Sequence, residues 1–169
     1  MKYAKKTDFK DLDQIIRLVN SAYRSDVGNN RWTSETGLVQ GHRLSLASLE
    51  LLITDADVDL YLCYLDDRLA GCIAITFHGD IAEFGTFAVA PELHNTGIGK
   101  ALLSFAEGAC RTDIRMFQVA VVSLNQDLIR FYERRGYRRT GAKIPFPAGA
   151  DVGKPTVDKL DLTVMKKRR

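Results

Sequence analysis

Residues 89–103 read Val89-Ala90-Pro91-Glu92-Leu93-His94-Asn95-Thr96-Gly97-Ile98-Gly99-Lys100-Ala101-Leu102-Leu103. An apolar run typical of a strand, residues 81–89, leads into this segment, and apolar residues then recur at helical spacing to about Cys110. A turn with two closely spaced glycines, Gly97 and Gly99, joins the two. The first N–H groups of a helix have no intrahelical acceptor, and the helix dipole is positive at that end. The sequence therefore predicts an anion site at this turn, although a tight turn alone would also explain the glycines.

Two common nucleotide-binding motifs are excluded by the residues around the second glycine. A dinucleotide fingerprint needs a third glycine three residues after the second, where this chain has Leu102. A P-loop needs Ser or Thr directly after its lysine, and here Ala101 follows Lys100. Lys100 either adds a positive charge to the turn or faces solvent, and the sequence leaves both open.

The turn resembles the acetyl-CoA motif of the GNAT superfamily of N-acetyltransferases. That motif is written Arg/Gln-x-x-Gly-x-Gly/Ala after a strand that ends in Val-x-Pro. Gly97 and Gly99 match its glycines, and residues 89–91 match the strand end. His94 occupies the first position, where Arg or Gln is commoner. This difference changes a side chain expected to contact pyrophosphate and leaves the backbone cradle intact.

A second segment extends the resemblance, which then covers residues 83–137. Asn125 followed by Phe131-Tyr132-Glu133-Arg134-Arg135-Gly136-Tyr137 is similar to the Asn…Phe-Tyr-Glu-x-x-Gly-Phe/Tyr segment of the same superfamily. The resemblance implies an acyltransferase that moves the acetyl group of acetyl-CoA, its cosubstrate, directly to a primary amine in a ternary complex without a metal. The alternative from another class is a non-catalytic acyl-CoA-binding sensor or regulatory domain of the same fold.

The resemblance also implies which residues hold acetyl-CoA. Backbone groups of the strand before the turn would pair with the pantetheine amides as another strand would, and an N–H there would suit the developing oxyanion. The expected cofactor-binding residues are Phe87, Ala88, Val89, His94, Asn95, Thr96, Gly97, Ile98, Gly99, Lys100, Asn125 and Tyr132. Asn125 is also suited to cap the helix that follows it.

Two residues are expected to be catalytic. Tyr132 matches the family's tyrosine near the sulfur, and a phenol with a pKa of about 10 can protonate a departing thiolate with a pKa of about 8.5. Without the motif, Tyr132 would be interpreted as a core aromatic residue. Glu83 lies on the strand where many family members carry a base that acts through water. Simple alternation places Glu83 on one face with Gly85, Phe87 and Val89.

The other reactive side chains form no recognisable set. His78, in an expected hairpin turn, and His94 are weaker candidates for a base. The three cysteines, Cys63, Cys72 and Cys110, lack metal-like spacing and are interpreted as reduced structural residues. The sequence indicates neither a metal site nor a Ser-His-Asp set.

The bulk composition is ordinary for a soluble globular protein. The 169 residues are 46% hydrophobic and 27% charged, which suits a single domain over residues 1–169. The sequence contains no apolar run of membrane-spanning length, and the N-terminus lacks the apolar core of a signal peptide. We therefore expect a cytoplasmic protein with no membrane partner.

The charge distribution argues against nucleic-acid binding. The net charge is +3, and residues 166–169 contribute +4, which leaves 3 − 4 = −1 for the rest of the chain. We interpret this basic end as a solvated, frayed terminus. A nucleic-acid contact through it is the alternative, but no basic stripe with interleaved aromatic residues accompanies it.

The periodicity and the turn residues predict a mixed α/β fold. The expected strands cover residues 1–5, 58–65, 69–77, 81–89, 114–122, 137–144 and 157–165. The expected helices cover residues 8–24, 45–54, 97–110 and 125–135, with Asp8 and Ser45 as caps of the first two and Gly136 closing the last. Short polar links make the second to fourth strands antiparallel, and the fifth should lie parallel to the fourth after a helical crossover. This order agrees with the GNAT fold, a mostly antiparallel sheet with one parallel, splayed pair and helices on both faces.

The acceptor amine is not identified by the sequence, and both small molecules and peptides remain open. Residues 25–43 and 145–155 are long irregular segments, which often carry specificity. In the resembling family the first of them forms one wall of the acceptor cleft, so Trp32, Thr33 and Glu35 are candidates for acceptor contacts. Alternatively, Trp32 fills the edge of the core. Dimers are common in the superfamily, which allows a homodimer here.

Overall fold

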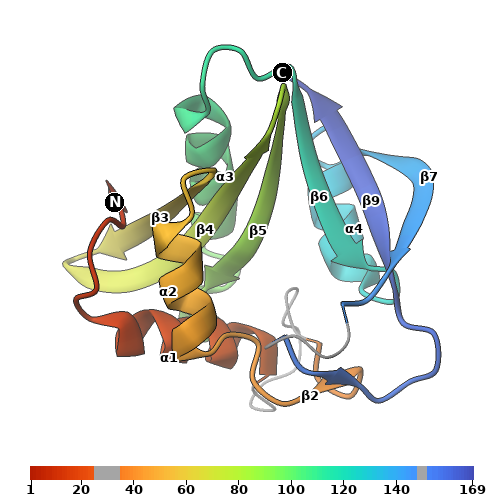
Figure 1. Cartoon of the computed structure of the whole chain (residues 1–169), viewed down its shortest axis with the longest axis horizontal. Helices are drawn as coiled ribbons and strands as arrows, with labels where there is room; N and C mark the ends of the chain where they lie inside the picture. The colour runs from red at the N-terminus through yellow and green to blue at the C-terminus, as the bar shows by residue number, and fades with distance from the viewer. Residues whose placement is uncertain (25–34, 148–151) are drawn as a thin grey trace.

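The computed structural model describes residues 1–24, 35–147 and 152–169, and Figure 1 shows their arrangement. The strands are β1 (Lys2–Lys5), β2 (Val39–Gln40), β3 (Val58–Leu65), β4 (Arg68–His78), β5 (Ile81–Val89), β6 (Met116–Val122), β7 (Arg138–Pro145), β8 (Lys154–Pro155) and β9 (Asp161–Arg168). The helices are α1 (Leu12–Arg24), α2 (Leu46–Thr54), the 3-10 turn η1 (Pro91–Leu93), α3 (Ile98–Ala109) and α4 (Gln126–Glu133).

A seven-stranded sheet runs through the molecule in the order β1-β3-β4-β5-β6-β9-β7. Its neighbours are antiparallel except β5 and β6, which are parallel. Helix α3 connects these two strands, because parallel neighbours need a long crossover. The predicted mixed fold with one parallel pair is therefore confirmed. Strands β2 and β8, which the sequence analysis missed, form a separate two-stranded sheet.

Tight turns set the antiparallel order of β3, β4 and β5. Asp66 and Asp67 join β3 to β4 with φ values of 50° and 58°. Gly79, in the link between β4 and β5, has a φ of 59°. Positive φ values at consecutive turn residues give the turn a twist that matches the flanking strands. The two predicted hairpins are confirmed.

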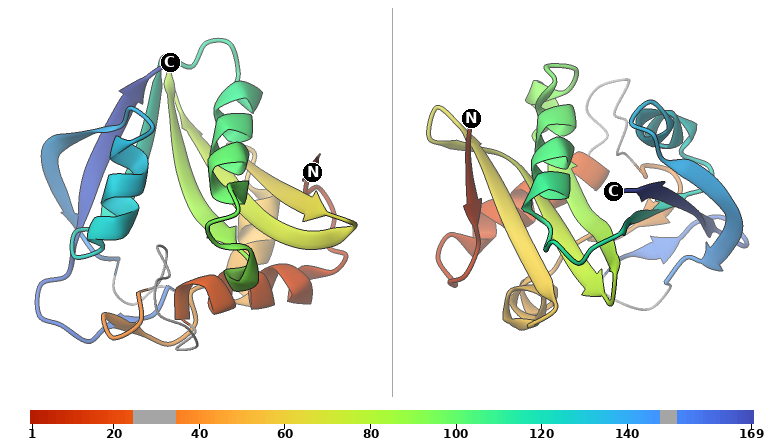
Figure 2. Two further views of the ribbon diagram at one scale, coloured as in Figure 1. Left: turned by 180° about the vertical axis from the view of Figure 1, so that it is seen from behind. Right: turned by 90° about the horizontal axis from the view of Figure 1, so that it is seen from above.

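Helices cover both faces of the sheet, as Figures 1 and 2 show from opposite sides. On one face, α3 and α4 pack against the sheet in a core that includes Leu102 and Ile129. On the other face, α1 and α2 pack in a second core that includes Ile15 and Leu49. Burial on both faces fixes β5, the strand that leads into the glycine turn.

The parallel pair separates along its length. Strands β5 and β6 pair at four positions, from Ile81 opposite Met116 to Phe84 opposite Val119. Beyond these positions the two strands continue without pairing to each other, and their ribbons diverge (Figure 1). Within the described ranges, no strand pairs with the β6-facing edge of β5 over residues 85–89.

Helix α1 begins later than predicted, and Asp8 does not cap it. The Oδ1 atom of Asp8 accepts a hydrogen bond from the backbone N–H of Lys10 at 3.2 Å. The resulting turn continues to Asp11, whose φ is 53°, and the helix starts at Leu12. Asp8 therefore stabilises a turn before the helix, which is the other position that aspartate favours.

The prediction of a frayed basic C-terminus is wrong. Strand β9 begins at Asp161 and not at residue 157, and it runs to Arg168 between β6 and β7. The Nζ atom of Lys167 lies 2.7 Å from Glu107 Oε2, and Arg169 N donates to the carbonyl of Arg115 at 3.0 Å. Lysine and arginine stems can cover a sheet while their charged ends stay in water, so four consecutive cations do not prevent strand pairing.

Candidate functional site

The segment between β5 and α3 presents the first turn of the helix. After η1, Asn95 and Gly97 have φ values of 63° and 91°. Gly97 is the N-cap of α3. A Cβ added at this position would meet no atom within 4 Å, so there is room for a side chain. The positive φ is therefore what favours glycine here. The hydrogen bond from Ala101 N to the Gly97 carbonyl (3.0 Å) opens the helical series, and the preceding N–H groups point out of the helix end.

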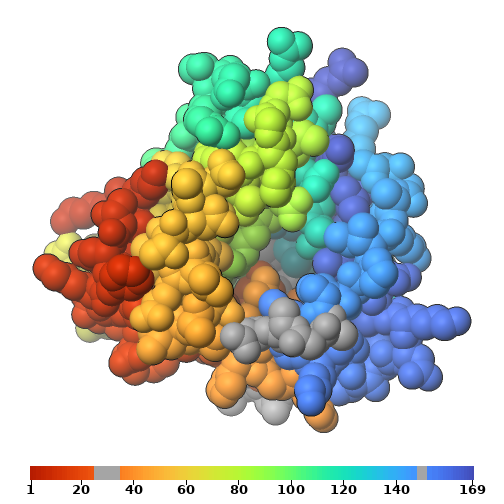
Figure 3. All heavy atoms as spheres, in the orientation of Figure 1, coloured from red at the N-terminus to blue at the C-terminus, as the bar shows by residue number. Residues whose placement is uncertain are grey.

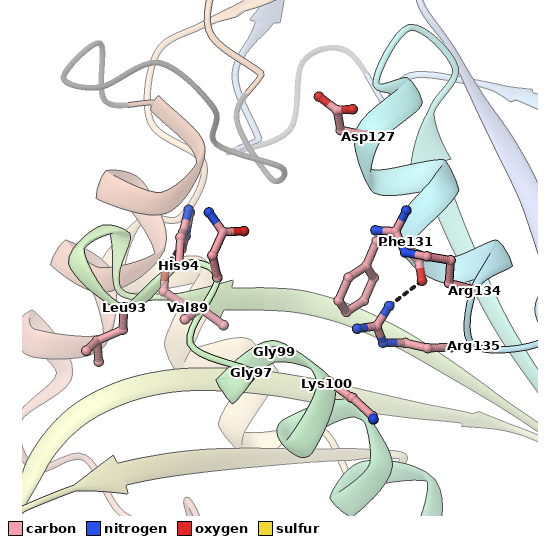
Figure 4. Close-up of a pocket in the computed structure, with 11 residues that line it drawn as sticks. Val89, Leu93, His94, Gly97, Gly99, Lys100, Asp127, Phe131, Arg134 and Arg135 are labelled. Carbon is pink, nitrogen blue, oxygen red and sulfur yellow. Dashed lines mark hydrogen bonds between the residues drawn. The ribbon is translucent and has the colours of Figure 1, made fainter.

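A cavity of about 390 Å³, which we name the turn cavity, lies between this turn and helix α4 (Figure 4). Its wall consists of Val89, Leu93, His94, Asn95, Gly97, Gly99, Lys100, Asp127, Phe131, Arg134 and Arg135. The last four residues belong to the segment that carries the second sequence motif. Folding therefore brings the two motifs to opposite sides of one cavity.

The turn cavity is basic. Lys100 lies on one side, and Arg134 and Arg135 lie on the other (Figure 4). Asp127, the acidic member of the wall named above, pairs with Arg130 at 2.8 Å. Together with the N–H groups and the positive end of the α3 dipole, these cations make the cavity suitable for a phosphate group.

Arg135 is held over the ring of Phe131. Its guanidinium carbon lies 3.4 Å from the ring centroid, and its Nη1 donates to the Phe131 carbonyl at 2.6 Å. Burial, reinforced by the neighbouring Arg134, lowers the pKa of Arg135, and among the described residues its Nε has no hydrogen-bond partner. Arg134 and Arg135 are not among the predicted site residues, because they stand at the unspecified x-x positions of the second motif.

His94 is turned back onto β5. Its Nε2 donates to the carbonyl of Val89 at 3.0 Å, and the residue lines the turn cavity. The histidine that replaces the commoner Arg or Gln therefore braces the end of the strand at the point where the turn begins.

A second cavity, of about 100 Å³, lies between the diverging strands, and we name it the gap cavity. This face of the molecule is hollowed between the green middle part of the chain and the blue C-terminal part (Figure 3). The wall includes Tyr23, Glu35, Arg43, Thr86, Phe87, Val121, Tyr132 and Phe146. Because β5 contributes Phe87 here and Val89 to the turn cavity, the two cavities follow one strand edge.

Tyr132 reaches the gap cavity from α4. It is 3% exposed, and its ring centroid lies 5.3 Å from those of both Phe131 and Tyr137. Burial, with a smaller effect from Tyr23, raises the pKa of Tyr132 well above the usual value for a tyrosine. Its phenol is therefore neutral and carries its proton at pH 7.

Four residues of the predicted cofactor set lie in neither cavity wall. Asn125 caps α4, and its Oδ1 accepts from the N–H three residues further on at 3.0 Å. Thr96 donates to the carbonyl of Leu93 at 2.6 Å. Ile98 and Ala88 are buried in the cores on opposite faces of the sheet. The structure therefore gives these residues a role in holding the turn and its flanking elements.

Glu83 lies where β5 and β6 still pair. Its Oε2 accepts a hydrogen bond from Gln118 Nε2 at 2.6 Å, and it is absent from the walls of both cavities. The prediction that Glu83 and Gly85 share a face with Phe87 and Val89 is wrong.

A β-bulge at Thr86 explains this correction. Pairing with β4 passes from Gly85 opposite Ala74 to Ala88 opposite Cys72, and Thr86 has a φ of 44°. An inserted residue reverses the facing of the residues that follow it. Phe87 and Val89 therefore face the α3 and α4 core, on the side of the sheet opposite Glu83, and Ala88 between them faces the other core.

The structure describes one of the three residues predicted to contact the acceptor. Trp32 and Thr33 lie outside the described residues. Glu35 is 8% exposed and lines the gap cavity. Arg43 lines the same cavity and was missed, because nothing in its neighbouring sequence marks it. His78, the other weak candidate for a base, is exposed at the end of β4 and lines neither cavity.

The cysteines are buried and form no disulfide. Burial raises the pKa of Cys72 to about 12 and that of Cys110 to about 11, so both are unreactive thiols at neutral pH. In the described ranges, no group of three or more His, Cys, Asp and Glu side chains is placed to hold a metal ion. Within the same ranges, none of the helices has the length and apolar character needed to span a bilayer.

Comparison with known proteins identifies the family of this chain. Residues 18–137, a range that contains both motifs, match the model of the acetyltransferase (GNAT) family. The chain belongs to the GNAT family.

Solved GNAT structures carry the same fold. The PaiA N-acetyltransferase from Thermoplasma acidophilum in complex with coenzyme A aligns over 100% of both chains, with a TM-score of 0.69 and 19% identity. A GNAT family acetyltransferase from Elizabethkingia anophelis with acetyl-CoA bound aligns over 74% of this chain and 84% of that chain, with a TM-score of 0.59 and 18% identity. The uncharacterized protein YxbD of Bacillus subtilis (strain 168) is 35% identical over 74 residues, which are 43% of this chain. The chain spans 45% of the length of YxbD.

Proposed function

We propose that this GNAT protein is an N-acetyltransferase that transfers the acetyl group of acetyl-CoA directly to a primary amine. The observation that carries the proposal is the position of the two cavities along one edge of β5, the basic turn cavity at one end and Tyr132 in the gap cavity at the other. Two structural neighbours hold coenzyme A or acetyl-CoA, and the charge of the turn cavity suits the pyrophosphate of such a ligand.

The residues present fit this cosubstrate. The N–H groups at the start of α3, with Lys100 and the two arginines of α4, would hold the phosphates. The pantetheine arm would follow the edge of β5 over residues 85–89, where β6 no longer pairs with it. The carbonyls of Phe87 and Val89 there already accept hydrogen bonds from Tyr23 (3.1 Å) and His94 (3.0 Å). A carbonyl oxygen has two lone pairs, so a carbonyl that accepts one hydrogen bond does not thereby lose the ability to accept a second from a ligand amide.

The transfer needs a proton donor and a proton acceptor. The cosubstrate supplies an acetyl thioester; the amine nitrogen forms a bond to its carbonyl carbon, and the carbon–sulfur bond breaks. Tyr132 would give its phenolic proton to the departing thiolate and regain one, relayed by water, from the attacking nitrogen as the amide becomes neutral. Glu83 lies outside both cavity walls, so it would accept the proton of the acceptor ammonium through water.

The proposal is tested with Tyr132→Phe. We expect wild-type protein to release free coenzyme A thiol from acetyl-CoA with members of a broad amine panel. Tyr132→Phe should lower kcat by about 100-fold, because a positioned acid contributes about 10² or more, and should leave the calorimetric affinity for acetyl-CoA unchanged. Tyr64→Phe, a change on β3 away from both cavities, is the matched control. Lack of affinity for acetyl-CoA would refute the proposal, and affinity without turnover of any amine would favour a sensor.

A further inference from the structure

Among the described residues, two with charged side chains line the gap cavity, Glu35 and Arg43. The rest of the wall is mostly apolar or aromatic, including Phe87, Leu128 and Phe146. A charge in such surroundings is costly unless it is paired. If either charge lacks a partner within the protein, a ligand of opposite charge would bind beside it.

Glu35 is paired within the protein. Its carboxylate forms an ion pair with Nη1 of Arg24, and the two side chains are 10% and 11% exposed. The other nitrogens of Arg24 donate to the carbonyls of Gly41 (2.9 Å) and Val152 (2.7 Å). The charge of Glu35 is thus balanced, and the donors of Arg24 are engaged.

Arg43 has no such carboxylate in the part of the chain that the structure describes. Its guanidinium carbon lies 5.1 Å from the centroid of the Tyr23 ring, and its backbone N–H donates to Asn20 Oδ1 at 2.6 Å. Stacking on an aromatic ring orients the N–H donors of a guanidinium but leaves its charge without a counterion. Arg43 is therefore a positioned anion-binding group in the cavity wall.

Tyr23 connects this group to the strand edge at which acetyl transfer is proposed. Its ring lies beneath Arg43, and its hydroxyl donates to the carbonyl of Phe87 at 3.1 Å. Tyr132 belongs to the same cavity wall. One tyrosine side chain separates the guanidinium from the backbone of β5, so a molecule of amino-acid size can reach both.

The geometry points to an acceptor that carries a carboxylate a few bonds from its primary amine, as α-amino acids do. Arg43 binds this carboxylate through two N–H···O hydrogen bonds, and the apolar wall receives an apolar side chain. A simple alkylamine or the side chain of an internal protein lysine offers Arg43 no such group. This inference rests on the proposed acetyltransferase function and names its acceptor class.

The first experiment compares acceptors with wild-type protein. The L-amino acids are screened for thiol release at saturating acetyl-CoA, beside amines that lack a carboxylate. The best amino acid is then compared with its amide and its decarboxylated amine, each at the same concentration of unprotonated nitrogen. We expect kcat/KM for the amino acid to be about 10- to 100-fold higher than for the other two, with the difference mostly in KM, as a charge-assisted pair provides.

The second experiment assigns this preference to Arg43. Arg43→Gln should raise KM for the amino acid and reduce the preference over its amide to near unity, with its folding checked by thermal melting. Arg17→Gln, which changes an exposed arginine of α1, should keep the preference. A preference retained in Arg43→Gln would overturn the inference. So would wild-type turnover that is equal for the three acceptors or confined to amines without a carboxylate, while the acetyltransferase assignment would stand. Failure to bind acetyl-CoA, or to acetylate any amine, would instead refute the function itself.

Discussion

Glu83 accepts a hydrogen bond from Gln118 at the end of the gap where β5 and β6 still pair. We expect Glu83→Gln to lower kcat by about 10- to 100-fold, because a general base typically contributes about 10²–10⁴ and bulk water replaces part of that effect. The affinity for acetyl-CoA should not change. Steady-state thiol release and calorimetry measure both quantities, and Glu50→Gln on the exposed side of α2 is the control. An unaltered kcat in Glu83→Gln would remove this residue from the mechanism.

At the residue scale, the sequence identified site residues where they belong to a motif with fixed spacing. It predicted that the glycine turn and the segment around Tyr132 act together, and in the structure both segments contribute to the wall of the turn cavity, while Tyr132 itself lines the gap cavity. It could not reveal the bulge at Thr86. The residues after the bulge are all apolar and both faces of the strand are buried there, so the sequence pattern does not change when the facing is reversed. It also could not reveal Arg43, since its position depends on packing against Tyr23, which is distant in the chain.

Helix α3 allows a direct test of the backbone cradle. Gly97 has a φ of 91°, and alanine in the left-handed region costs about 1–2 kcal/mol even though no atom lies within 4 Å of the new Cβ. We expect Gly97→Ala to lower the melting temperature and to raise the Kd for acetyl-CoA by about 10-fold, because the first-turn amides move.

Gly108→Ala, within the same helix, is the matched control for Gly97→Ala. Its new Cβ also meets no atom within 4 Å, and its φ is not positive. Alanine there should stabilise the protein by about 0.5–1 kcal/mol and leave the Kd unchanged. Thermal unfolding and calorimetry report both effects, and equal affinities in Gly97→Ala and wild type would show that acetyl-CoA does not use this turn.

At the element scale, helices and strands with a clear period were predicted well. Strands β3 and β5 have the predicted bounds, and Ser45 caps α2 through the N–H of Ser48. Strands β2 and β8 are two residues long, which is too short for any period to be seen. The start of α1 was misplaced because an aspartate before a helix can serve a turn as well as a cap.

At the scale of the whole molecule, we expect the stability to fall at alkaline pH. Burial raises the pKa of Cys72 and of Tyr23 to about 12, while unfolded cysteine and tyrosine titrate near about 8.5 and 10. A group whose pKa is higher in the folded state stabilises the fold fully below its unfolded pKa, and this contribution is lost as the pH rises through the folded value. The melting temperature should therefore decline between about pH 8.5 and 12.

Calorimetric melting at a series of pH values measures this decline. Cys72→Ala should make the curve less steep above about pH 8.5, because one of the groups that must stay protonated is removed. An identical slope in the variant and in wild type would show that Cys72 does not contribute to the loss.

The sheet has two halves, one formed by β1, β3, β4 and β5 and the other by β6, β9 and β7. Four paired positions join β5 to β6, and among the described residues no other strand pairing connects the halves. Beyond this short seam, the two half-sheets are held together by the side chains of one core that spans both of them. A molecule bound as proposed, along β5 and against α4, would add contacts between the halves where strand pairing is missing. We therefore expect the bound cosubstrate to stabilise the fold as a whole.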